Sequence, residues 1–171
     1  MLIAIIADTH MPRGGRRLPA ACVERIATAD LLLHAGDFTT LAVVRELEAI
    51  GPPLAGVHGN GDSGELRRLM PTERIIEAGG ARIAMTHDAG PRTGRLERMR
   101  RRFGDRADAL VFGHSHLPLN ERAEDGFQIF NPGSPTERRR APRHTMGLAR
   151  LADGNVRFEL IELIPRAGES T

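Results

Sequence analysis

Seven side chains of types that bind metal ions follow apolar segments of this chain. Each lies directly after a run of residues typical of a buried strand. In an open α/β sheet the carboxyl ends of the strands lie along one edge, where sites are built. Side chains that are far apart in the sequence can therefore converge there. The seven are Asp8, His10, Asp37, Asn60, His87, His114 and His116.

The chemistry of this donor set favours a transition metal. Carboxylate, imidazole and amide oxygen together suit Mn, Fe, Ni or Zn better than Ca or Mg. The single cysteine, Cys22, excludes an internal disulfide and a zinc site of paired cysteines. An Asp-x-His sequence at 8–10 and a His-x-His sequence at 114–116 share one spacing, and in extended backbone residues i and i+2 point to the same side. We therefore expect each pair to present two ligands to one small volume.

Each motif alone has a plainer explanation. An isolated Asp-x-His is usually a loop or capping feature, and the Gly-Asp at 36–37 and the Gly-Asn at 59–60 are typical of turns. The combination is specific, because five separate strand ends each bring residues of metal-binding type. His34 and His58 lie inside predicted strands, so we interpret them as core histidines, with a supporting role beside the metal ligands left open.

The apolar pattern predicts the elements that position these side chains. The first half alternates strands and helices, a βαβαβ order that implies a parallel sheet. In the second half, glycine-rich turns separate paired apolar segments, which indicates hairpins. We predict strands over 2–7, 31–34, 54–58 and 109–112, helices over 18–27, 40–50 and 93–103, and hairpins that pair 73–78 with 81–86, 119–124 with 127–130 and 145–151 with 156–163.

The composition is that of an ordinary globular chain. Of its 171 residues, 40% are hydrophobic and 27% are charged, and the length fits one domain. We expect this domain to span residues 1–164 and a polar, frayed tail to follow over residues 165–171. The apolar N-terminus is short and lacks a basic start, and no stretch approaches a membrane span. These observations favour a cytoplasmic protein.

The basic residues do not indicate nucleic-acid binding. The formal net charge is only +2, and base-stacking aromatics are scarce, with six Phe, no Tyr and no Trp. All 24 basic residues are arginine, and several of them cluster in the predicted helix at 93–103 and in a later loop at 138–143. A solvated face explains most of them. Arg95 and Arg98 are our candidates for binding an anionic substrate.

Taken in order, the motifs resemble those of the calcineurin-like metallophosphoesterase superfamily, particularly its small YfcE-type phosphodiesterases. The likeness covers nearly the whole chain and includes the Asn-Pro-Gly-Ser sequence at 131–134. It implies an α/β fold, a four-layer α/β/β/α sandwich of two mixed β-sheets. It also implies two divalent ions per chain (Mn, Ni, Fe or Zn), one on Asp8, His10 and His116 and the other on Asn60, His87 and His114, with Asp37 bridging them.

The resemblance implies hydrolysis of a small phosphate-ester substrate, foremost a diester, by a metal-activated water, with Asp37, Asn60 and His87 at the catalytic centre. One departure is Gly61, because larger relatives place there a histidine that assists the leaving group. The alternatives are a non-catalytic scaffold of the same fold, as in the eukaryotic retromer, and a nuclease. Whether the chain forms a homo-oligomer is left open.

Overall fold

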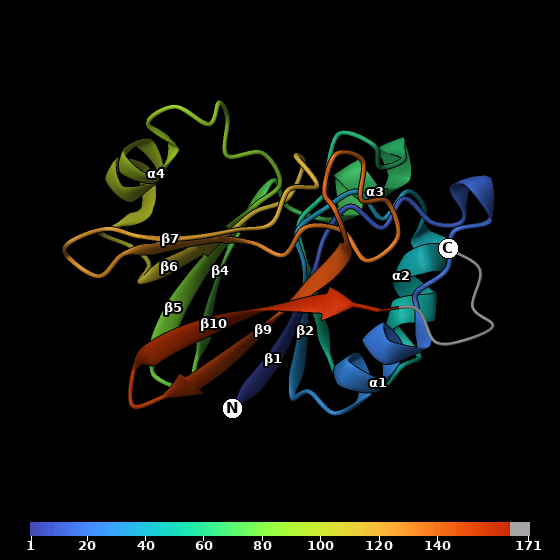
Figure 1. The fold of residues 1–171 in the computed structure, drawn as a ribbon, viewed down its shortest axis with the longest axis horizontal. Coiled ribbons are helices and arrows are strands. Elements are labelled where there is room, and N and C mark those ends of the chain that lie inside the picture. Colours follow the sequence, from blue (N-terminus) through green and yellow to red (C-terminus); the bar gives the residue numbers. More distant parts are fainter. Residues whose placement is uncertain (165–171) are drawn as a thin grey trace.

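The computed structural model describes residues 1–164, so the tail predicted at 165–171 lies outside the described residues. Within 1–164, two five-stranded sheets face each other and helices cover both outer sides (Figure 1). This is the predicted α/β/β/α sandwich of two mixed sheets. In chain order the elements are β1 (Leu2–Ile6), η1 (Arg13–Gly15), α1 (Ala20–Ala27), β2 (Leu31–His34), α2 (Leu41–Glu48), β3 (Leu54–Gly56), α3 (Gly64–Leu69), β4 (Glu73–Ala78), β5 (Ala81–Thr86), α4 (Arg95–Phe103), β6 (Ala109–Val111), β7 (Leu119–Arg122), β8 (Gln128–Asn131), β9 (His144–Ala152) and β10 (Asn155–Leu163).

The first sheet has the strand order β10-β9-β1-β2-β3. Its β1, β2 and β3 run parallel to one another, and β9 runs antiparallel to both β1 and β10. The βαβαβ prediction for the first half of the chain is confirmed. The carboxyl ends of β1, β2 and β3 consequently lie at one edge.

The second sheet has the strand order β4-β5-β6-β8-β7. The predicted hairpins β4-β5 and β7-β8 are antiparallel, whereas β5-β6 and β6-β8 are parallel. The ends of β5, β6 and β8 therefore also lie together. The predictions did not include the parallel pairing of β8 with β6.

Strand β1 shows why its sequence is continuously apolar. Ile3 and Ile5 pack into the core between the two sheets, whereas Ala4 and Ile6 pack against the helices that cover the first sheet. Both faces of the strand are thus buried, as expected for a central parallel strand. On the other side of the sandwich, α4 packs on the outer face of the second sheet through Met99 and Phe103.

Several boundaries differ from the prediction. Helix α1 begins only after Pro19, and α2 ends at Glu48. Strand β3 ends at Gly56, so His58 lies beyond the strand and is half-buried. Helix α3 was not predicted, although its N-cap Ser63 accepts a hydrogen bond from the Leu66 amide at 3.3 Å. Across the described residues, no helix combines the length and apolar character that a membrane crossing requires.

Candidate metal centre

Loops from both sheets meet where the parallel strands end. The Asp8 amide after β1 donates to the Gly36 carbonyl after β2 at 2.9 Å, and the Gly113 amide after β6 donates to the His87 carbonyl after β5, also at 2.9 Å. These bonds tie neighbouring strand ends within each sheet. The His87 ring then joins the sheets, because its Nδ1 donates to the Ala35 carbonyl at 2.8 Å.

Asp8, His10 and His116 form the first group of donors. The Nε2 atoms of the two histidines lie 3.3 Å apart on stacked rings, and His116 Nε2 lies 3.7 Å from Asp8 Oδ1. The donor atoms of all three side chains lie within 4.8 Å of one another. Three buried donors that converge in this way could hold one metal ion.

Asp37 lies between this group and the next. Its Oδ2 is 3.4 Å from His10 Nε2 and 3.5 Å from His87 Nε2. Asp8, Asp37 and His87 form a second group whose donor atoms also lie within 4.8 Å. The Asp37 carboxylate thus has a histidine on either side, and Asp8 belongs to both groups. The bridging role of Asp37 stays a prediction.

Asn60 and His114 complete the set. Asn60 Oδ1 lies 3.1 Å from His87 Nε2 and 2.9 Å from His114 Nδ1. All seven predicted side chains are therefore linked by short contacts, although Asn60 and His114 are exposed. Their role as metal ligands stays a prediction.

Backbone carbonyls fix the orientation of two rings. Besides the bond from His87 to Ala35, His116 Nδ1 donates to the Glu137 carbonyl. In each ring the Nδ1 proton is engaged, which leaves Nε2 facing the other donors. Ligating histidines are commonly held in this way by their second ring nitrogen.

The backbone of the site differs from the extended geometry expected for the paired motifs. Five of the seven residues have a left-handed φ between +45° and +67°, which is uncommon for residues other than glycine: Asp8, His10, Asp37, His114 and His116. The side chains converge because of tight left-handed turns at the strand ends, so the i, i+2 explanation was wrong. Unfavourable backbone of this kind persists only where surrounding contacts enforce it, and it clusters at functional sites.

One oxygen of Asp8 fits a bound cation. Asp8 Oδ1 accepts from the His114 amide at 3.1 Å, but the buried Oδ2 has no hydrogen-bond partner among residues 1–164. Burial raises the pKa of this carboxyl to about 7. A buried carboxylate without a partner is unfavourable, and a divalent cation between the donors would compensate it.

The other ionisable groups are suited to the same role. Burial lowers the pKa of His10, and it lowers that of His116 to about 4, so both imidazoles are neutral and free to bind metal at neutral pH. Burial alone would raise the pKa of Asp37, but the contacts with His87 and the Gly61 amide outweigh it and hold that pKa below its usual range. Asp37 is thus an anion in the absence of metal.

Glycines allow the close approach of loops around the two carboxylates. A Cβ at Gly59 would lie 2.6 Å from the Asp37 amide nitrogen and closer still to Oδ1, and one at Gly61 would lie 3.1 Å from the Asp37 carboxylate. A Cβ at Gly113 would lie 3.1 Å from Asp8 Oδ2. The sequence shows these glycines only as turn residues, whereas the structure shows that they make space for the donors.

We expect Gly59→Ala to displace Asp37 and remove bound metal. The added Cβ cannot be accommodated without moving the Asp37 backbone and carboxylate. Metal content by mass spectrometry should fall well below that of the original chain. Gly64→Ala is the matched control, because a Cβ there would meet only Arg68 at 3.7 Å and alanine favours the helix that begins at this position. Full metal content in Gly59→Ala would contradict the close-approach argument.

Two acidic residues have roles that the sequence did not reveal. The Asp62 carboxylate accepts hydrogen bonds from the amides of Asp37, Thr39 and Gly59 at 3.1, 2.7 and 2.7 Å. It joins the loops after β2 and β3.

Glu137 was not a candidate at all, and it lies beside the site. Its Oε2 is 3.6 Å from His10 Nε2, and its Oε1 accepts from Arg16 at 2.9 Å. Glu137 lies in the loop after β8. Because β8 is parallel to β6 and ends at the same edge of the sheet, recognising that pairing would have revealed Glu137.

The Asn-Pro-Gly-Ser sequence supports the site from this loop. Asn131 Nδ2 donates to the Gly113 carbonyl at 2.8 Å, and the Ser134 hydroxyl donates to the Asp8 carbonyl at 2.8 Å. The loop after β8 thereby fixes the backbone beside His114 and that of Asp8.

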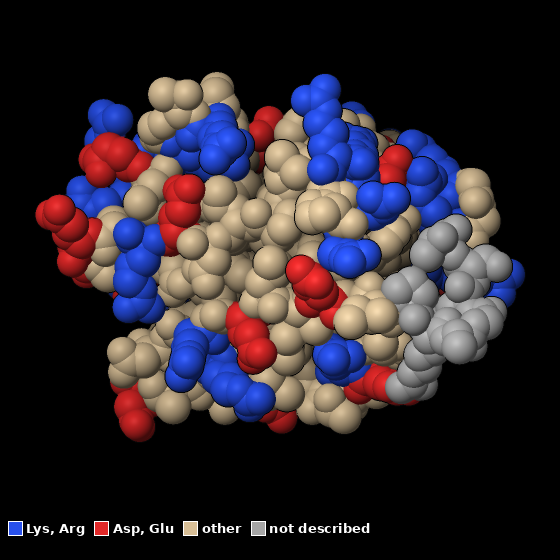
Figure 2. Space-filling view, viewed as in Figure 1, with Lys and Arg blue, Asp and Glu red and all other residues tan. Residues whose placement is uncertain are grey.

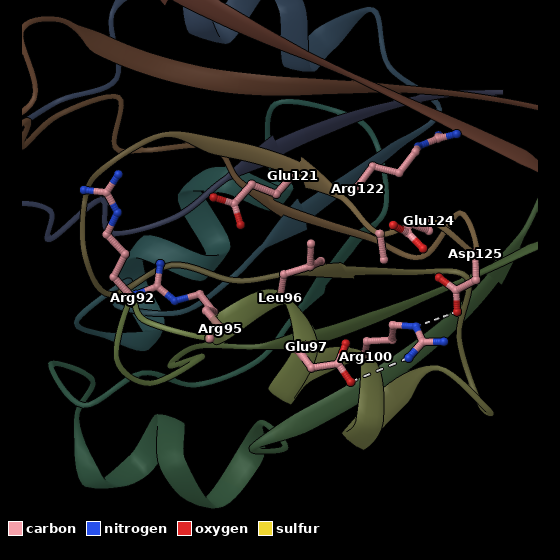
Figure 3. A pocket seen from close by; sticks show the side chains of 11 residues that line it. Arg92, Arg95, Leu96, Glu97, Arg100, Glu121, Arg122, Glu124 and Asp125 are labelled. Atoms are coloured by element: carbon pink, nitrogen blue, oxygen red, sulfur yellow. Dashed lines mark hydrogen bonds and ion pairs between the residues drawn. The ribbon is translucent and has the colours of Figure 1, made fainter.

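Arg95 and Arg98 contact the loop after β5 rather than any of the seven donors. Arg95 donates to the Gly90 carbonyl at 2.8 Å, and Arg98 donates to the Ala89 and Pro91 carbonyls at 3.0 and 2.7 Å. Figure 2 shows arginines interspersed with acidic residues in the region of α4. Arg95 also lines a hollow between α4 and β7 (Figure 3). Binding of substrate by this pair stays a prediction.

Comparison with known proteins agrees with this architecture. The chain matches the calcineurin-like phosphoesterase superfamily domain over residues 1–154. It is 36% identical over 139 residues to a Methanothermobacter thermautotrophicus protein named a probable metallophosphoesterase, with 80% of this chain and 78% of that protein covered. It is 29% identical over 147 residues to a phosphodiesterase of Methanocaldococcus jannaschii, with 78% and 83% covered.

A solved structure extends the comparison to the fold. Wild-type Vps29 of Entamoeba histolytica complexed with Zn²⁺ superposes with a TM-score of 0.72 over 95% of this chain and 99% of that chain, at 22% identity. This likeness shows a shared fold. With a domain match over most of its length and a relative above 30% identity, the chain belongs to the calcineurin-like phosphoesterase superfamily.

Proposed function

We propose that the protein is a metal-dependent phosphodiesterase with two divalent ions per chain. The observation that carries this proposal is the buried Oδ2 of Asp8, which has no hydrogen-bond partner among residues 1–164 and lies within a set of converging side chains. One ion would be held by Asp8, His10 and His116. The other would be held by Asn60, His87 and His114, and Asp37 would bind both ions. Divalent ions held there would polarise phosphoryl oxygens and lower the pKa of water.

The residues of the chain supply position and charge. The bond from His87 to the Ala35 carbonyl fixes one ring, and that from His116 to the Glu137 carbonyl fixes another. Asp8 and Asp37 bring two negative charges against the four positive charges of two divalent ions. The net positive charge that remains favours an anionic phosphate ester.

A diester is favoured over a monoester by position 61. The histidine that larger relatives place there is replaced by glycine, so a cationic partner for a second negative charge on the phosphate is missing at that position. A diester carries only one such charge. The relative named a phosphodiesterase supports the same choice. A nuclease is disfavoured, because all six Phe are buried and none offers a surface for stacking bases.

The test is reconstitution of metal-free protein with Mn, Ni, Zn, Fe or Mg, followed by assays with bis-p-nitrophenyl phosphate and p-nitrophenyl phosphate. We expect activity only with metal, two ions per chain, and faster cleavage of the diester. Two bound ions without hydrolysis of either ester would support the scaffold alternative. A single ion at full occupancy would contradict the binuclear centre.

A further inference from the structure

A small hollow lies beside the metal centre and is lined by positive charge. Ser115, Leu117, Arg139 and Arg140 enclose about 320 Å³, which is at the lower end of the size of small-ligand sites. Ser115 and Leu117 flank His116 in the sequence, so the hollow begins next to that donor. We call it the Arg139 hollow.

The guanidinium groups that line it are available to a ligand. Within residues 1–164, neither Arg139 nor Arg140 has a side-chain hydrogen bond or an ion pair in the structure, and both residues are exposed. Neighbouring arginines differ, because Arg16 pairs with Glu137 and Arg138 donates to the Ala141 carbonyl. In the space-filling view, arginine side chains gather over the loop between β8 and β9 (Figure 2).

Arg139 belongs to a loop that contacts the first group of donors. Glu137 Oε2 is 3.6 Å from His10 Nε2, and the Glu137 carbonyl accepts a hydrogen bond from His116 Nδ1. Arg139 follows two residues later and has a left-handed φ of +47°. The Arg139 hollow therefore lies beside the donors of the first proposed ion.

The larger hollow between α4 and β7 lacks this charge imbalance. It encloses about 600 Å³, and four arginines and four acidic residues line it. Arg100 pairs there with Asp125 at 2.6 Å and with Glu97 at 3.6 Å (Figure 3). Its charges are compensated within the protein, whereas no carboxylate lines the Arg139 hollow.

We propose that the Arg139 hollow binds a second anionic group, carried on one ester arm of the substrate. This inference rests on the proposed phosphoesterase function. The scissile phosphate would lie at the metal ions, and the arm would pass over Leu117, a residue that is 44% exposed. Arg139 and Arg140 bind the carboxylate or phosphate on that arm. The substrate class is a phosphate diester with a further negative charge a few bonds from the scissile phosphorus.

The test compares two phosphonates that differ in one carboxylate. Isothermal titration of the metal-loaded protein would use 3-phosphonopropionate and propylphosphonate. We expect about fivefold to tenfold tighter binding of the first, because two exposed arginines each contribute modestly. In the Arg139→Gln/Arg140→Gln double variant, the two phosphonates should bind with about equal affinity. It should persist in Arg143→Gln, an exposed arginine of the same loop that does not line the hollow.

A parallel assay separates this inference from the proposed function. It compares hydrolysis of the p-nitrophenyl esters of 2-carboxyethyl phosphate and of ethyl phosphate. If neither ester is hydrolysed but the phosphonate preference follows the two arginines, the proposed function fails and the binding site stands. The inference is overturned if both esters are hydrolysed but the original chain shows no preference for the ligand with the carboxylate. It is also overturned if the double variant keeps that preference.

Discussion

The variant Asp37→Asn should lower kcat/KM for bis-p-nitrophenyl phosphate by roughly 10³-fold or more. The Asp37 carboxylate lies between His10 and His87, with Oδ2 at 3.4 and 3.5 Å from their Nε2 atoms. Its loss weakens the binding of both proposed ions. Metal ions contribute several kcal/mol of transition-state stabilisation, and about 1.4 kcal/mol corresponds to a factor of ten in rate.

The fold should survive this substitution. The side-chain oxygen of the introduced asparagine can still accept from the Gly61 amide, which donates to Asp37 Oδ1 at 2.6 Å. Asparagine also tolerates the left-handed φ of +62° at this position better than most residues. Circular dichroism of metal-free protein should therefore show nearly unchanged thermal unfolding, while the number of ions per chain decreases.

Asp88→Asn is the matched control for this change. Asp88 follows the donor His87 but is exposed, and its Oδ1 accepts from the Gly90 amide at 2.7 Å. An asparagine can make the same bond, so metal content and activity should be close to those of the original chain. If Asp37→Asn retains both ions and near-original activity, Asp37 is not the bridge.

The sequence was most informative where elements are regular. Continuous apolar runs at 2–7 and 31–34 predicted central strands, because such strands are buried on both faces. Parallel order then placed the residues after those strands at one edge without any knowledge of loop geometry. This is why seven side chains from distant parts of the chain could be predicted to converge, and the structure brings them together, while their role as metal ligands stays a prediction.

Loop geometry was not predictable, because tertiary contacts impose it. The left-handed turns at Asp8 and Asp37 depend on bonds from Ser134 and to Asp62, which come from distant parts of the chain. No local preference in the sequence specifies them. Glu137 was missed for a related reason: the hairpin of β7 and β8 was predicted, but not the parallel pairing of β8 with β6 that brings the following loop to the site.

The rate of hydrolysis should depend steeply on the leaving group. We expect aryl diesters such as bis-p-nitrophenyl phosphate to be cleaved about 10²–10⁴-fold faster than alkyl diesters, which is the usual contribution of a general acid. Gly61 stands where larger relatives have a histidine. A side chain at this position would also press on the Asp37 carboxylate, since a Cβ would lie 3.1 Å from it.

Two arginines beside Gly61 do not replace the missing acid. Arg13 donates to the Gly61 carbonyl at 3.4 Å, and Arg67 donates to the Asn60 carbonyl. Arginine stays protonated at any pH of interest and is therefore a poor proton donor. Among the described residues, the acids that could be considered are His34, Asp62, His58 and Glu137.

Three of these four are unsuited to donate a proton to a leaving group. His34 is fully buried, and burial lowers its pKa well below the usual value. Both carboxylate oxygens of Asp62 accept hydrogen bonds from backbone amides, so neither is turned toward a leaving group. His58 Nε2 lies 3.2 Å from the Thr72 hydroxyl, and its Nδ1 is buried. Of these four residues, Glu137 is the one whose carboxyl group lies next to a proposed metal ligand, with Oε2 at 3.6 Å from His10 Nε2.

The measurement is kcat/KM at saturating metal for phosphodiesters of graded leaving-group pKa. A steep decline from good to poor leaving groups is the expected result, because the leaving oxygen departs without a proton. A flat series would show that an acid assists after all. Glu137→Gln would then identify it: if Glu137 is the acid, the variant should restore a steep dependence while aryl diesters are still cleaved. If the series stays flat in that variant as well, Glu137 is not the acid. The argument that a missing histidine at position 61 makes the rate depend on the leaving group then fails.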